Sequence, residues 1–349
     1  MPVTTTDARA LLPATATPAT VYDCAFLDLD GVVYTGSQRV EGAADALTQA
    51  RALGMRLAFV TNNALRTPAQ VAEKLGKAGV AAQPRDIITS AQAVAAVIAE
   101  RHGRGARVLI VGGEGLAQAL TDAGLRTVET ADDHPDAVAQ GFGGPDMPFS
   151  RFTEACLAIN AGALWYASNP DPTIPTDRGA APGNGAAIDL LRTSTGSAPV
   201  IAGKPYPPIH QAAVDRTHAS RPLCVGDRLD TDIAAGHQNS SDTLLVLTGV
   251  TDAAQLIAAP PAQRPTYIAE DLADGLLRAH PAATREGGRG SACNGWLARI
   301  DAGTLRLEGE GSRTDALRAL CHAAWTADGD SPSTVRADEA LDSVRMSAT

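Results

Sequence analysis

Two carboxylates stand one residue apart directly after an apolar run, in the segment CAFLDLDGVVYTG at residues 24–36. Asp28 and Asp30 repel each other, and burial disfavours the charged form of each. Side chains two residues apart on a strand point to the same face, so both carboxylates are expected on one side. Such a pair at the end of a buried strand requires water or a cation to stabilise it.

Other polar residues also follow predicted strands. Thr61, Asn62 and Asn63 come after RLAFV, Lys204 comes after APVIAG, and Asp227 comes after PLCVG. Ligands of open parallel sheets bind at the carboxyl ends of the strands. These residues are therefore expected to meet at one edge of a sheet.

The segment GDRLDTD at residues 226–232 adds acidic groups, of which Asp227 and Asp232 are predicted to point inward. With Asp28 and Asp30 they offer hard oxygen ligands, which suit Mg²⁺. A carboxylate nucleophile, a divalent cation, a lysine and a hydroxyl are the groups that phosphoryl transfer requires, because charge on the transferred oxygens must be neutralised.

The elements that must position these groups are predicted to form an α/β fold. Short apolar runs alternate with helix-like stretches over residues 21–87 and 196–280, which predicts a doubly wound parallel sheet with helices on both faces as the catalytic core. Between Thr61 and Lys204 lie 142 residues, far more than one strand-helix-strand step needs. Residues 88–195 are therefore predicted to form an inserted α/β cap domain.

The ends of the chain differ from this core. Residues 1–20 have no long apolar run and no basic start, which indicates a flexible tail and no signal peptide. Residues 281–349 form a C-terminal extension, with a linker at 281–295, a β-hairpin in WLARIDAGTLRLEG, a helix in TDALRALCHAAWTA and disorder from residue 328 onward. The hairpin and helix are too small to bury a core alone, so they are expected to dock on the rest of the protein or on another subunit.

Composition excludes several classes of partner. A formal charge of −10 and a sequence pI of about 5.1 argue against nucleic acid and anionic membranes. No apolar run reaches membrane-spanning length. The odd count of five cysteines, without a CxxC pair, favours buried thiols in the reducing cytoplasm. Formation of a homo-oligomer is left open.

The motifs also resemble a known family. DLDGV at 28–32, TNN at 61–63, GKP at 203–205 and GDRLDTD at 226–232 resemble, in this order, the four motifs of the haloacid dehalogenase superfamily. The insert resembles the C2-type cap of its class II phosphatases, and ASNPD and PGNGA resemble the end of that cap. The resemblance covers residues 21–280 and points to the p-nitrophenyl phosphatase branch, which includes phosphoglycolate, pyridoxal phosphate, nucleotide and glycerol 3-phosphate phosphatases.

The resemblance implies a role for each acidic residue. Asp28 would be the nucleophile that forms an aspartyl-phosphate, and Asp30 would be the general acid and base. Mg²⁺ would be held by Asp28, Asp227 and the backbone carbonyl of Asp30. Asp232 would be a ligand, either directly or through water.

The same resemblance implies roles for the polar residues. Thr61 would donate a hydrogen bond to the phosphoryl group, with Asn62 and Asn63 nearby as substrate-binding residues. Lys204 would offset negative charge. For Asn169 and Asp171 two interpretations remain open: they shape a proline-rich turn, or they face the substrate.

The predicted reaction is hydrolysis of a small phosphorylated metabolite, with glycerol 3-phosphate as first choice. This choice rests on resemblance, in composition and C-terminal extension, to relatives with that activity. Phosphoglycolate, pyridoxal phosphate and nucleotide monophosphates are the alternatives. A receiver-like or degenerate phosphate-binding module is disfavoured, because Asp28 and Asp30 share one strand and both are present.

The segment REGGRG at 285–290 fits the pyrophosphate-binding loop of N-acetyltransferases. That loop needs a strand before it and a helix after it, and neither flank is predicted to supply them. An acetyltransferase-like remnant is therefore the minor alternative to a linker.

Overall fold

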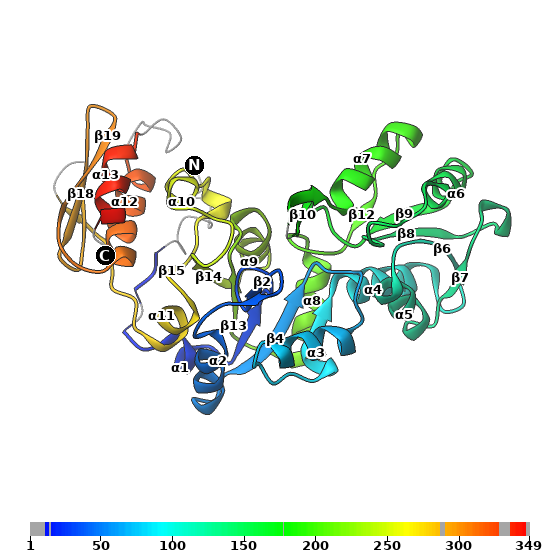
Figure 1. Ribbon diagram of the computed structural model, residues 1–349, viewed down its shortest axis with the longest axis horizontal. Coiled ribbons are helices and arrows are strands. Elements are labelled where there is room, and N and C mark those ends of the chain that lie inside the picture. Colours follow the sequence, from blue (N-terminus) through cyan, green and yellow to red (C-terminus); the bar gives the residue numbers. More distant parts are fainter. Residues whose placement is uncertain (1–10, 14, 177, 287–289, 328–335, 347–349) are drawn as a thin grey trace. The chain divides into compact units, whose positions relative to one another are not determined.

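A computed structural model describes residues 11–13, 15–176, 178–286, 290–327 and 336–346 (Figure 1). The chain divides into two compact units. The first comprises Met1–Thr35, Arg39–Leu57 and Ser220–Thr349, and the second comprises Gly36–Gln38 and Ala58–Ala219. Each unit is described by itself.

The first unit contains parallel strands in the order β15–β14–β13–β1. These are β15 (Tyr267–Ala269), β14 (Asp242–Val246), β13 (Pro222–Gly226) and β1 (Cys24–Leu27). All four residues of β1 are buried, as expected for a strand covered on both faces. The predicted parallel α/β core is thereby confirmed for these strands.

Short helices and turns complete this part of the first unit. Helix α2 packs against α11, and α1 also contacts α11. The elements are α1 (Pro18–Val21), β2 (Tyr34–Thr35), β3 (Gln38–Arg39, which straddles the two units), α2 (Ala43–Ala52), η4 (Leu229–Ile233), α9 (Ala234–Gln238), α10 (Ala253–Ile257), η5 (Pro261–Gln263) and α11 (Leu272–Leu277).

The predicted flexible tail is wrong for the described part of residues 1–20. Leu11 is buried in a hydrophobic cluster, and its backbone N–H donates to the carbonyl of Pro265 at 3.1 Å. Helix α1 begins at Pro18. Leu11 and Leu12 stand in a segment without apolar periodicity, so the sequence did not indicate that Leu11 packs in the core. Residues 1–10 lie outside the described residues.

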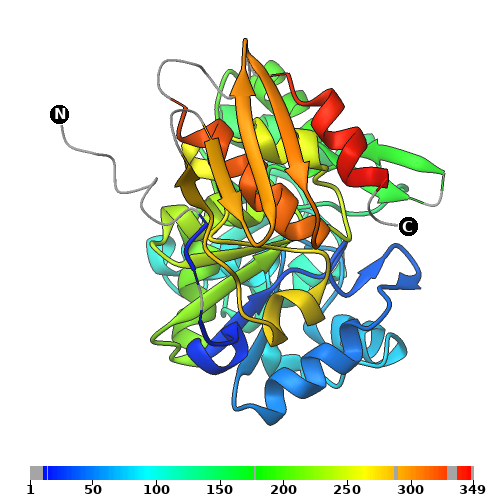
Figure 2. The ribbon, with the colours of Figure 1, turned by 90° about the vertical axis from the view of Figure 1, so that its left-hand side faces the viewer.

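The C-terminal extension forms an antiparallel sheet in the order β16–β17–β18–β19 (Figure 2). Its strands are β16 (Thr284–Glu286), β17 (Gly290–Cys293), β18 (Trp296–Asp301) and β19 (Thr304–Gly309), and its helices are α12 (Arg313–Trp325) and α13 (Asp338–Met346). Figure 2 shows the orange strands in front of α12, which contacts β17 and β18. The predicted hairpin and the predicted helix are confirmed by β18, β19 and α12.

Two other expectations for the extension are wrong. The predicted linker contains β16 and β17, whose backbones pair with Arg285 opposite Ser291. These residues show no alternating apolar pattern, so the sequence did not indicate the strands. The stretch predicted to be disordered contains α13, whose Ala340 and Leu341 are buried. Residues 328–335 and 347–349 lie outside the described residues.

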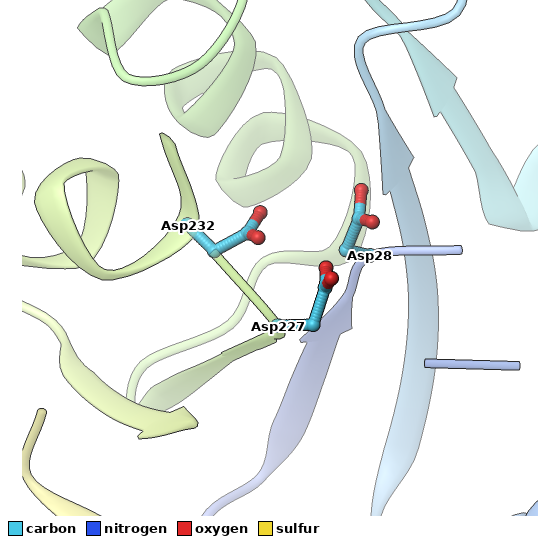
Figure 3. Close-up of side chains that lie close together, drawn as sticks. All are labelled: Asp28, Asp227 and Asp232. Carbon is cyan, nitrogen blue, oxygen red and sulfur yellow. The ribbon is translucent and has the colours of Figure 1, made fainter. Parts of the chain in front are cut away.

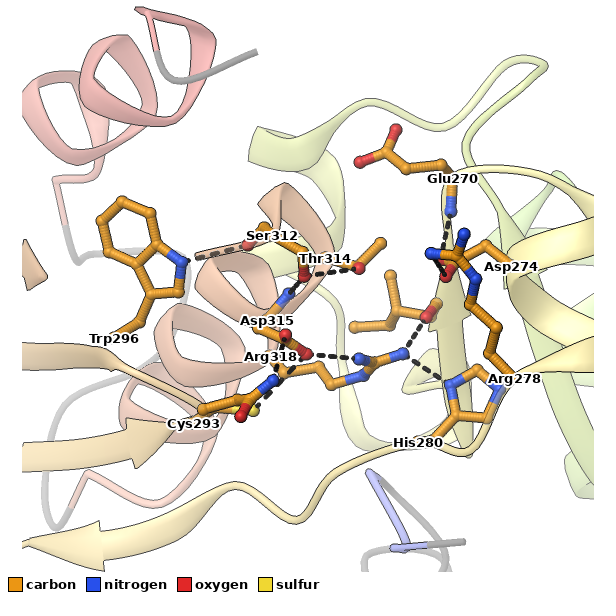
Figure 4. Close-up of polar contacts among 12 residues, drawn as sticks. Glu270, Asp274, Arg278, His280, Cys293, Trp296, Ser312, Thr314, Asp315 and Arg318 are labelled. Carbon is orange, nitrogen blue, oxygen red and sulfur yellow. Dashed lines mark hydrogen bonds and ion pairs between the residues drawn. The ribbon is translucent and has the colours of Figure 1, made fainter. Parts of the chain in front are cut away.

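The extension packs on the rest of the first unit, which confirms the predicted docking. One hydrophobic cluster joins α12 residues such as Leu317 to Ile268 of β15 and Ile257 of α10. Arg318 of α12 is buried with Asp315 at 2.7 Å, and it donates to the carbonyl of Ile268 and to His280 Nδ1, each at 2.5 Å (Figure 4).

The second unit contains the pair β4 (Arg56–Thr61) and β5 (Ile87–Thr89), with β4 running into it from the first unit. It also contains a parallel sheet in the order β12–β9–β8–β6–β7. Figure 1 shows α6 and α7 on one face of that sheet and α4 and α5 on the other. A cluster that includes Val138, Ile159 and Leu191 fills the space under α6 and α7.

The second unit has the following elements. The strands of the larger sheet are β12 (Val200–Ile201), β9 (Leu164–Ala167), β8 (Ala137–Gln140), β6 (Arg107–Val111) and β7 (Arg126–Val128), and β10 (Thr173–Thr176) pairs with β11 (Gly179–Pro182). The helices are α3 (Pro68–Lys77), η2 (Pro84–Asp86), α4 (Ser90–His102), α5 (Glu114–Asp122), η3 (Ala131–Asp133), α6 (Phe149–Asn160), α7 (Asn184–Thr195) and α8 (Pro207–Thr217).

Residues 88–195, predicted to be the inserted cap, lie within the second unit. One boundary differs from the prediction. Residues 196–280 were assigned to the core, but β12 pairs with β9 in register Val200 to Tyr166. The apolar pattern of a two-residue strand does not indicate in the sequence which sheet the strand joins. The division into cap and core otherwise stays a prediction.

Among the described residues, no helix combines the length and apolar character that crossing a bilayer would require. All five cysteines fall within the described residues and are free thiols. Four of these thiols are buried, as predicted, and Cys156 is partly buried.

Candidate active site and metal centre

Three carboxylates gather at the carboxyl ends of β1 and β13 (Figure 3). One oxygen each of Asp28, Asp227 and Asp232 lies within 4.8 Å of the others. Asp227 and Asp232 are 1% and 3% exposed, and Asp28 is partly buried. Such proximity of buried like charges is costly without a compensating positive charge.

Adjacent strands account for the meeting of Asp28 and Asp227. β1 and β13 run parallel with Leu27 opposite Val225, so each aspartate emerges at the same edge of the sheet. The backbone N–H of Asp28 extends this pairing by donating to the carbonyl of Val225 at 2.8 Å. Two segments separated by about 200 residues thus deliver carboxylates to one point.

A π-helical turn brings Asp232 back to the same place. In η4 the N–H of Asp232 donates to the carbonyl of Arg228 at 3.1 Å, and the N–H of Arg228 donates to Asp232 Oδ2 at 3.2 Å. Asp230 instead pairs with Arg228 at 2.9 Å and is exposed. Asp232 and not Asp230 therefore lies with Asp28 and Asp227, as predicted.

Glycines leave room for these carboxylates. A Cβ on Gly31 or Gly249 would lie 2.4 or 2.0 Å from Asp227 Oδ2. A Cβ on Gly226 would lie 2.1 Å from the carboxyl carbon of Asp232. Side chains at these positions would displace the carboxylates, so the backbone around the cluster is packed against its oxygens.

The donor set suits a hard divalent cation. Three aspartates offer oxygen ligands only, which Mg²⁺ prefers, and they carry enough negative charge to attract it. The carboxylate of Asp30 lies outside this group among the described residues, and its backbone forms a bridge with Tyr34. This agrees with a role for Asp30 that uses its carbonyl for the metal and its carboxyl for proton transfer, which stays a prediction.

The second unit brings together most of the predicted polar residues through the side chain of Asn62. Its Oδ1 accepts from the backbone N–H of Lys204 at 2.8 Å. Its Nδ2 donates to the carbonyl of Lys204 at 3.1 Å and to Asp171 Oδ1 at 3.0 Å. The amide of Asn62 is thus used within the protein, which favours a positioning role over the predicted substrate contact.

Asn63 and Asn169 are used in a similar way. Asn63 Oδ1 accepts from the N–H groups of Leu65 and Arg66, at 3.0 and 3.1 Å. Asn169 is 4% exposed, and its Nδ2 donates to the carbonyl of Asn62 at 2.7 Å. Its Oδ1 accepts from the N–H of Asp171 at 3.1 Å. Of the two interpretations left open for Asn169, these contacts favour the shaped turn.

Thr61 and Lys204 are both buried, at 4% and 6% exposure. The Oγ1 of Thr61 accepts from the N–H of Asn63 at 3.1 Å, an arrangement that leaves its hydroxyl proton to point elsewhere. Lys204 Nζ donates to the carbonyl of Val60 at 3.0 Å, at the end of β4. The ammonium group of Lys204 is therefore oriented along the same strand that carries Thr61.

Several supporting residues had not been predicted. Ser90 Oγ donates to the carbonyl of Asn62 at 2.6 Å, and Asn184 Nδ2 donates to the carbonyl of Asn169 at 2.7 Å. In the first unit the N–H of Val250 donates to Asp227 Oδ2 at 2.7 Å. For Val250 a signal was available, because LTGV directly follows a predicted strand. Ser90 begins a helix in the sequence and gave no separate signal.

Comparison with known proteins identifies the family. A family model described as haloacid dehalogenase-like hydrolase matches residues 25–126, and a related model of the same hydrolases matches residues 201–275. D-glycerol 3-phosphate phosphatase of Mycobacterium tuberculosis is 48% identical over 251 residues, which cover 72% of this chain and 70% of that protein. The chain belongs to the haloacid dehalogenase-like hydrolases. The predicted resemblance and fold class are confirmed.

Two further comparisons match different shares of this chain. Acid sugar phosphatase of Staphylococcus haemolyticus is 38% identical, with 92% of its length matched to 70% of this chain. A crystal structure of glycerol phosphate phosphatase from Mycobacterium tuberculosis in complex with magnesium has 39% identity and a TM-score of 0.85. That match covers 95% of this chain and 99% of the other.

A third family model, described as GCN5-related N-acetyltransferase like domain, matches residues 293–345. The match begins after REGGRG at 285–290, and the last residue of that segment, Gly290, begins strand β17 and not a helix. A pyrophosphate-binding loop needs the N-terminus of a helix. The segment therefore has no described geometry for acetyl-CoA, although the extension resembles that domain family.

Proposed function

We propose that the protein is a Mg²⁺-dependent phosphatase that hydrolyses a small phosphomonoester through an aspartyl-phosphate on Asp28. The observation that carries this proposal is the cluster of Asp28, Asp227 and Asp232, whose oxygens lie within 4.8 Å of one another in a hydrolase of this family. Bound Mg²⁺ would neutralise these carboxylates and polarise the phosphoryl oxygens.

Asp28 and Asp30 would perform the two chemical steps. A carboxylate oxygen of Asp28 attacks phosphorus, the bond to the alkoxide breaks, and Asp30 gives its proton to the leaving oxygen. Asp30 then takes a proton from water, which attacks phosphorus and releases inorganic phosphate from Asp28. The proton balance closes, because Asp30 regains the proton that it donated.

Thr61 and Lys204 are proposed to contact the phosphoryl group, where a hydroxyl donor and a positive charge favour the transition state. The chain's formal charge of −10 makes such a local cation necessary for an anionic substrate. Asn62, Asn63 and Asn169 would hold the surrounding loops, and Asp171 would be oriented by Asn62 at 3.0 Å.

Glycerol 3-phosphate is the proposed substrate. The relative named for it is 48% identical, and the crystal structure named for glycerol phosphate matches 95% of this chain, including the extension. The acid sugar phosphatase matches 70% of this chain. Sugar phosphates, phosphoglycolate, pyridoxal phosphate and nucleotide monophosphates are therefore the comparison substrates.

We also propose a cytoplasmic location, because five free thiols fit a reducing compartment. No nucleic-acid partner is expected at this charge. Size-exclusion chromatography with light scattering measures the oligomeric state.

The test is a screen of the purified protein against these phosphomonoesters with Mg²⁺, with EDTA and after Mg²⁺ is restored. We expect Mg²⁺-dependent release of phosphate, with the highest kcat/KM on glycerol 3-phosphate. Asp28→Asn should lower kcat by about 10³-fold or more, because the nucleophile and a metal ligand are lost together. Hydrolysis that survives chelation, or an active Asp28→Asn protein, would contradict the mechanism.

A further inference from the structure

A short segment after β14, Thr248–Thr251 in the sequence TGVT, contacts both loops that carry the acidic cluster. Thr248 Oγ1 donates to the carbonyl of Gly31 at 2.5 Å. The N–H of Val250 donates to Asp227 Oδ2 at 2.7 Å, and the N–H of Thr251 donates to the carbonyl of Asp227 at 3.2 Å. No acidic residue lies in this segment, so it supplies no carboxylate ligand of its own.

The contacts to Asp227 constrain both its main chain and its side chain. The Thr251 bond fixes the backbone position from which the side chain leaves. The Val250 bond fixes one carboxylate oxygen, and with it the rotation of the carboxylate plane. Hydrogen bonds to metal-binding carboxylates are known to orient them and to tune metal affinity.

Gly249, between these donors, has no conformational reason to be glycine. Among the described residues, those with positive φ do not include Gly249. A Cβ there would nevertheless lie 2.0 Å from Asp227 Oδ2 and 2.6 Å from its Cβ. The position is therefore restricted by the closeness of the Asp227 side chain alone.

The bond from Thr248 links this segment to the other side of the cluster. Gly31 follows Asp28 and Asp30 in the same loop. A Cβ added to Gly31 would lie 2.4 Å from Asp227 Oδ2. Thr248 thus sets the distance between the loop of Asp28 and the segment that orients Asp227. The two ligands come from different strands, and this segment contacts both.

We propose that Thr248–Thr251 is a positioning segment that sets the Mg²⁺ affinity of the cluster by orienting Asp227 relative to the loop of Asp28. The inference rests on the proposed function, since it takes Mg²⁺ as the cation. Substitutions in Thr248–Thr251 are expected to weaken Mg²⁺ binding although they remove none of the three carboxylate ligands.

Gly249→Ala tests the close approach, with Gly76→Ala as the matched control. A Cβ on Gly76, in α3, meets nothing within 4 Å. Calorimetric titration of the full-length protein with Mg²⁺ should give a Kd about 10 to 100 times higher for Gly249→Ala and an unchanged Kd for Gly76→Ala. At saturating Mg²⁺ the kcat of Gly249→Ala should return to within a few-fold of wild type. An unchanged Kd in Gly249→Ala would overturn the proposal.

Thr248 provides a second test that does not depend on the folding of Gly249→Ala. Thr248→Val keeps the shape and removes the hydroxyl donor, whereas Thr248→Ser keeps the donor. We expect a several-fold weaker Mg²⁺ affinity for the valine variant and near-wild-type affinity for the serine variant. Equal affinities for both would overturn the proposal. Wild-type protein that fails to bind Mg²⁺ would instead refute the proposed cofactor, so the two failures are distinguishable.

Discussion

Asp28 and Asp30 are separated by one residue, yet the structure gives their carboxylates different surroundings. The carboxylate of Asp28 lies with Asp227 and Asp232, while that of Asp30 lies outside this group among the described residues. The strand ends at Leu27, before either aspartate, so strict alternation does not govern the pair. A nucleophile beside the cation and a proton donor apart from it are what the proposed reaction needs.

Asp30→Asn should separate acid catalysis from nucleophilic attack. The variant keeps Asp28 and the acidic cluster but cannot protonate the leaving alkoxide. We expect kcat on glycerol 3-phosphate to fall by about 10²-fold to 10⁴-fold, and kcat on p-nitrophenyl phosphate to fall much less, because its phenolate leaves without a proton. Asp230→Asn, at an exposed residue paired with Arg228, is the matched control and should change neither value. Equal losses on both substrates would exclude this role for Asp30.

The sequence predicted the residues of the acidic cluster but not what surrounds them. Asp28 and Asp227 follow apolar runs, and adjacent parallel strands must bring such residues together. Thr248 and Gly249 have no charge, so their contacts became visible only in three dimensions. Asn62 and Asn169 were predicted from motifs, yet their hydrogen-bond partners depend on how loops fold, which spacing along the chain does not encode.

At the scale of elements, α12 is fixed to the core by the buried side chain of Arg318, which also pairs with Asp315 of the same helix. Arg318 and Asp315 are 6% and 7% exposed, and Arg318 also donates to the carbonyl of Ile268 in β15. The amphipathic pattern of α12 was readable in the sequence. That the charged residue Arg318 would be buried was not readable, because only Asp315 among its partners lies on α12, while the others come from β15 and from the segment that carries His280 (Figure 4).

Arg318→Ala should lower the free energy of unfolding by about 3 to 5 kcal/mol, because the charge of Asp315 is then left buried without its partner. Arg278→Ala is the matched control, since its side chain is 77% exposed and its guanidinium lies 3.7 Å from Asp274 Oδ1. We expect less than about 1 kcal/mol for the control. Urea unfolding followed by tryptophan fluorescence measures both. Similar values for the two variants would show that buried Arg318 does not stabilise the docking of α12.

His280 makes this junction sensitive to acid. Arg318 can only donate, so His280 Nδ1 must accept, while its Nε2 donates to the carbonyl of Gly275 at 2.9 Å. Burial, together with the charge of Arg318, lowers the pKa of His280 below its usual value, and the carboxylates of Asp274 and Asp315 act in the opposite direction. The ring also stacks on Tyr267 at 4.8 Å. The folded state therefore holds a neutral imidazole.

Because the folded pKa is lowered, the unfolded chain binds the proton more tightly. His280 therefore contributes stability above its unfolded pKa of about 6.5, and this stability is lost as pH falls below that value. His280→Gln, which does not titrate, should show a shallower decrease in melting temperature between about pH 7 and pH 5. Parallel pH profiles for wild type and variant would contradict this. The other buried histidines are present in both proteins, so their contribution to the pH dependence of the melting temperature cancels in the comparison.

At the scale of the whole chain, one hydrophobic core contacts both the extension and the turn that carries Asp232. This hydrophobic core contains Leu229 and Ile233, which flank Asp232 in η4, together with Trp296 and Leu317 of the extension. The four motifs end by Asp232, so residues 281–349 contribute no motif residue to the site. The shared core nevertheless connects the extension to the turn that carries Asp232.

A chain that stops at residue 280 should lose both stability and metal affinity. Removing Trp296, Leu317 and their neighbours exposes buried apolar residues of β14, β15 and α10, which favours aggregation. The turn that holds Asp232 loses packing on Leu229 and Ile233, so its carboxylate is less well placed for Mg²⁺. We expect a lower melting temperature, a larger mass in size-exclusion chromatography and a higher Kd for Mg²⁺ in the remaining monomer. The full-length Arg278→Ala protein serves as the folded control. A truncated monomer with wild-type melting temperature and Mg²⁺ affinity would show that the phosphatase core is complete without the extension.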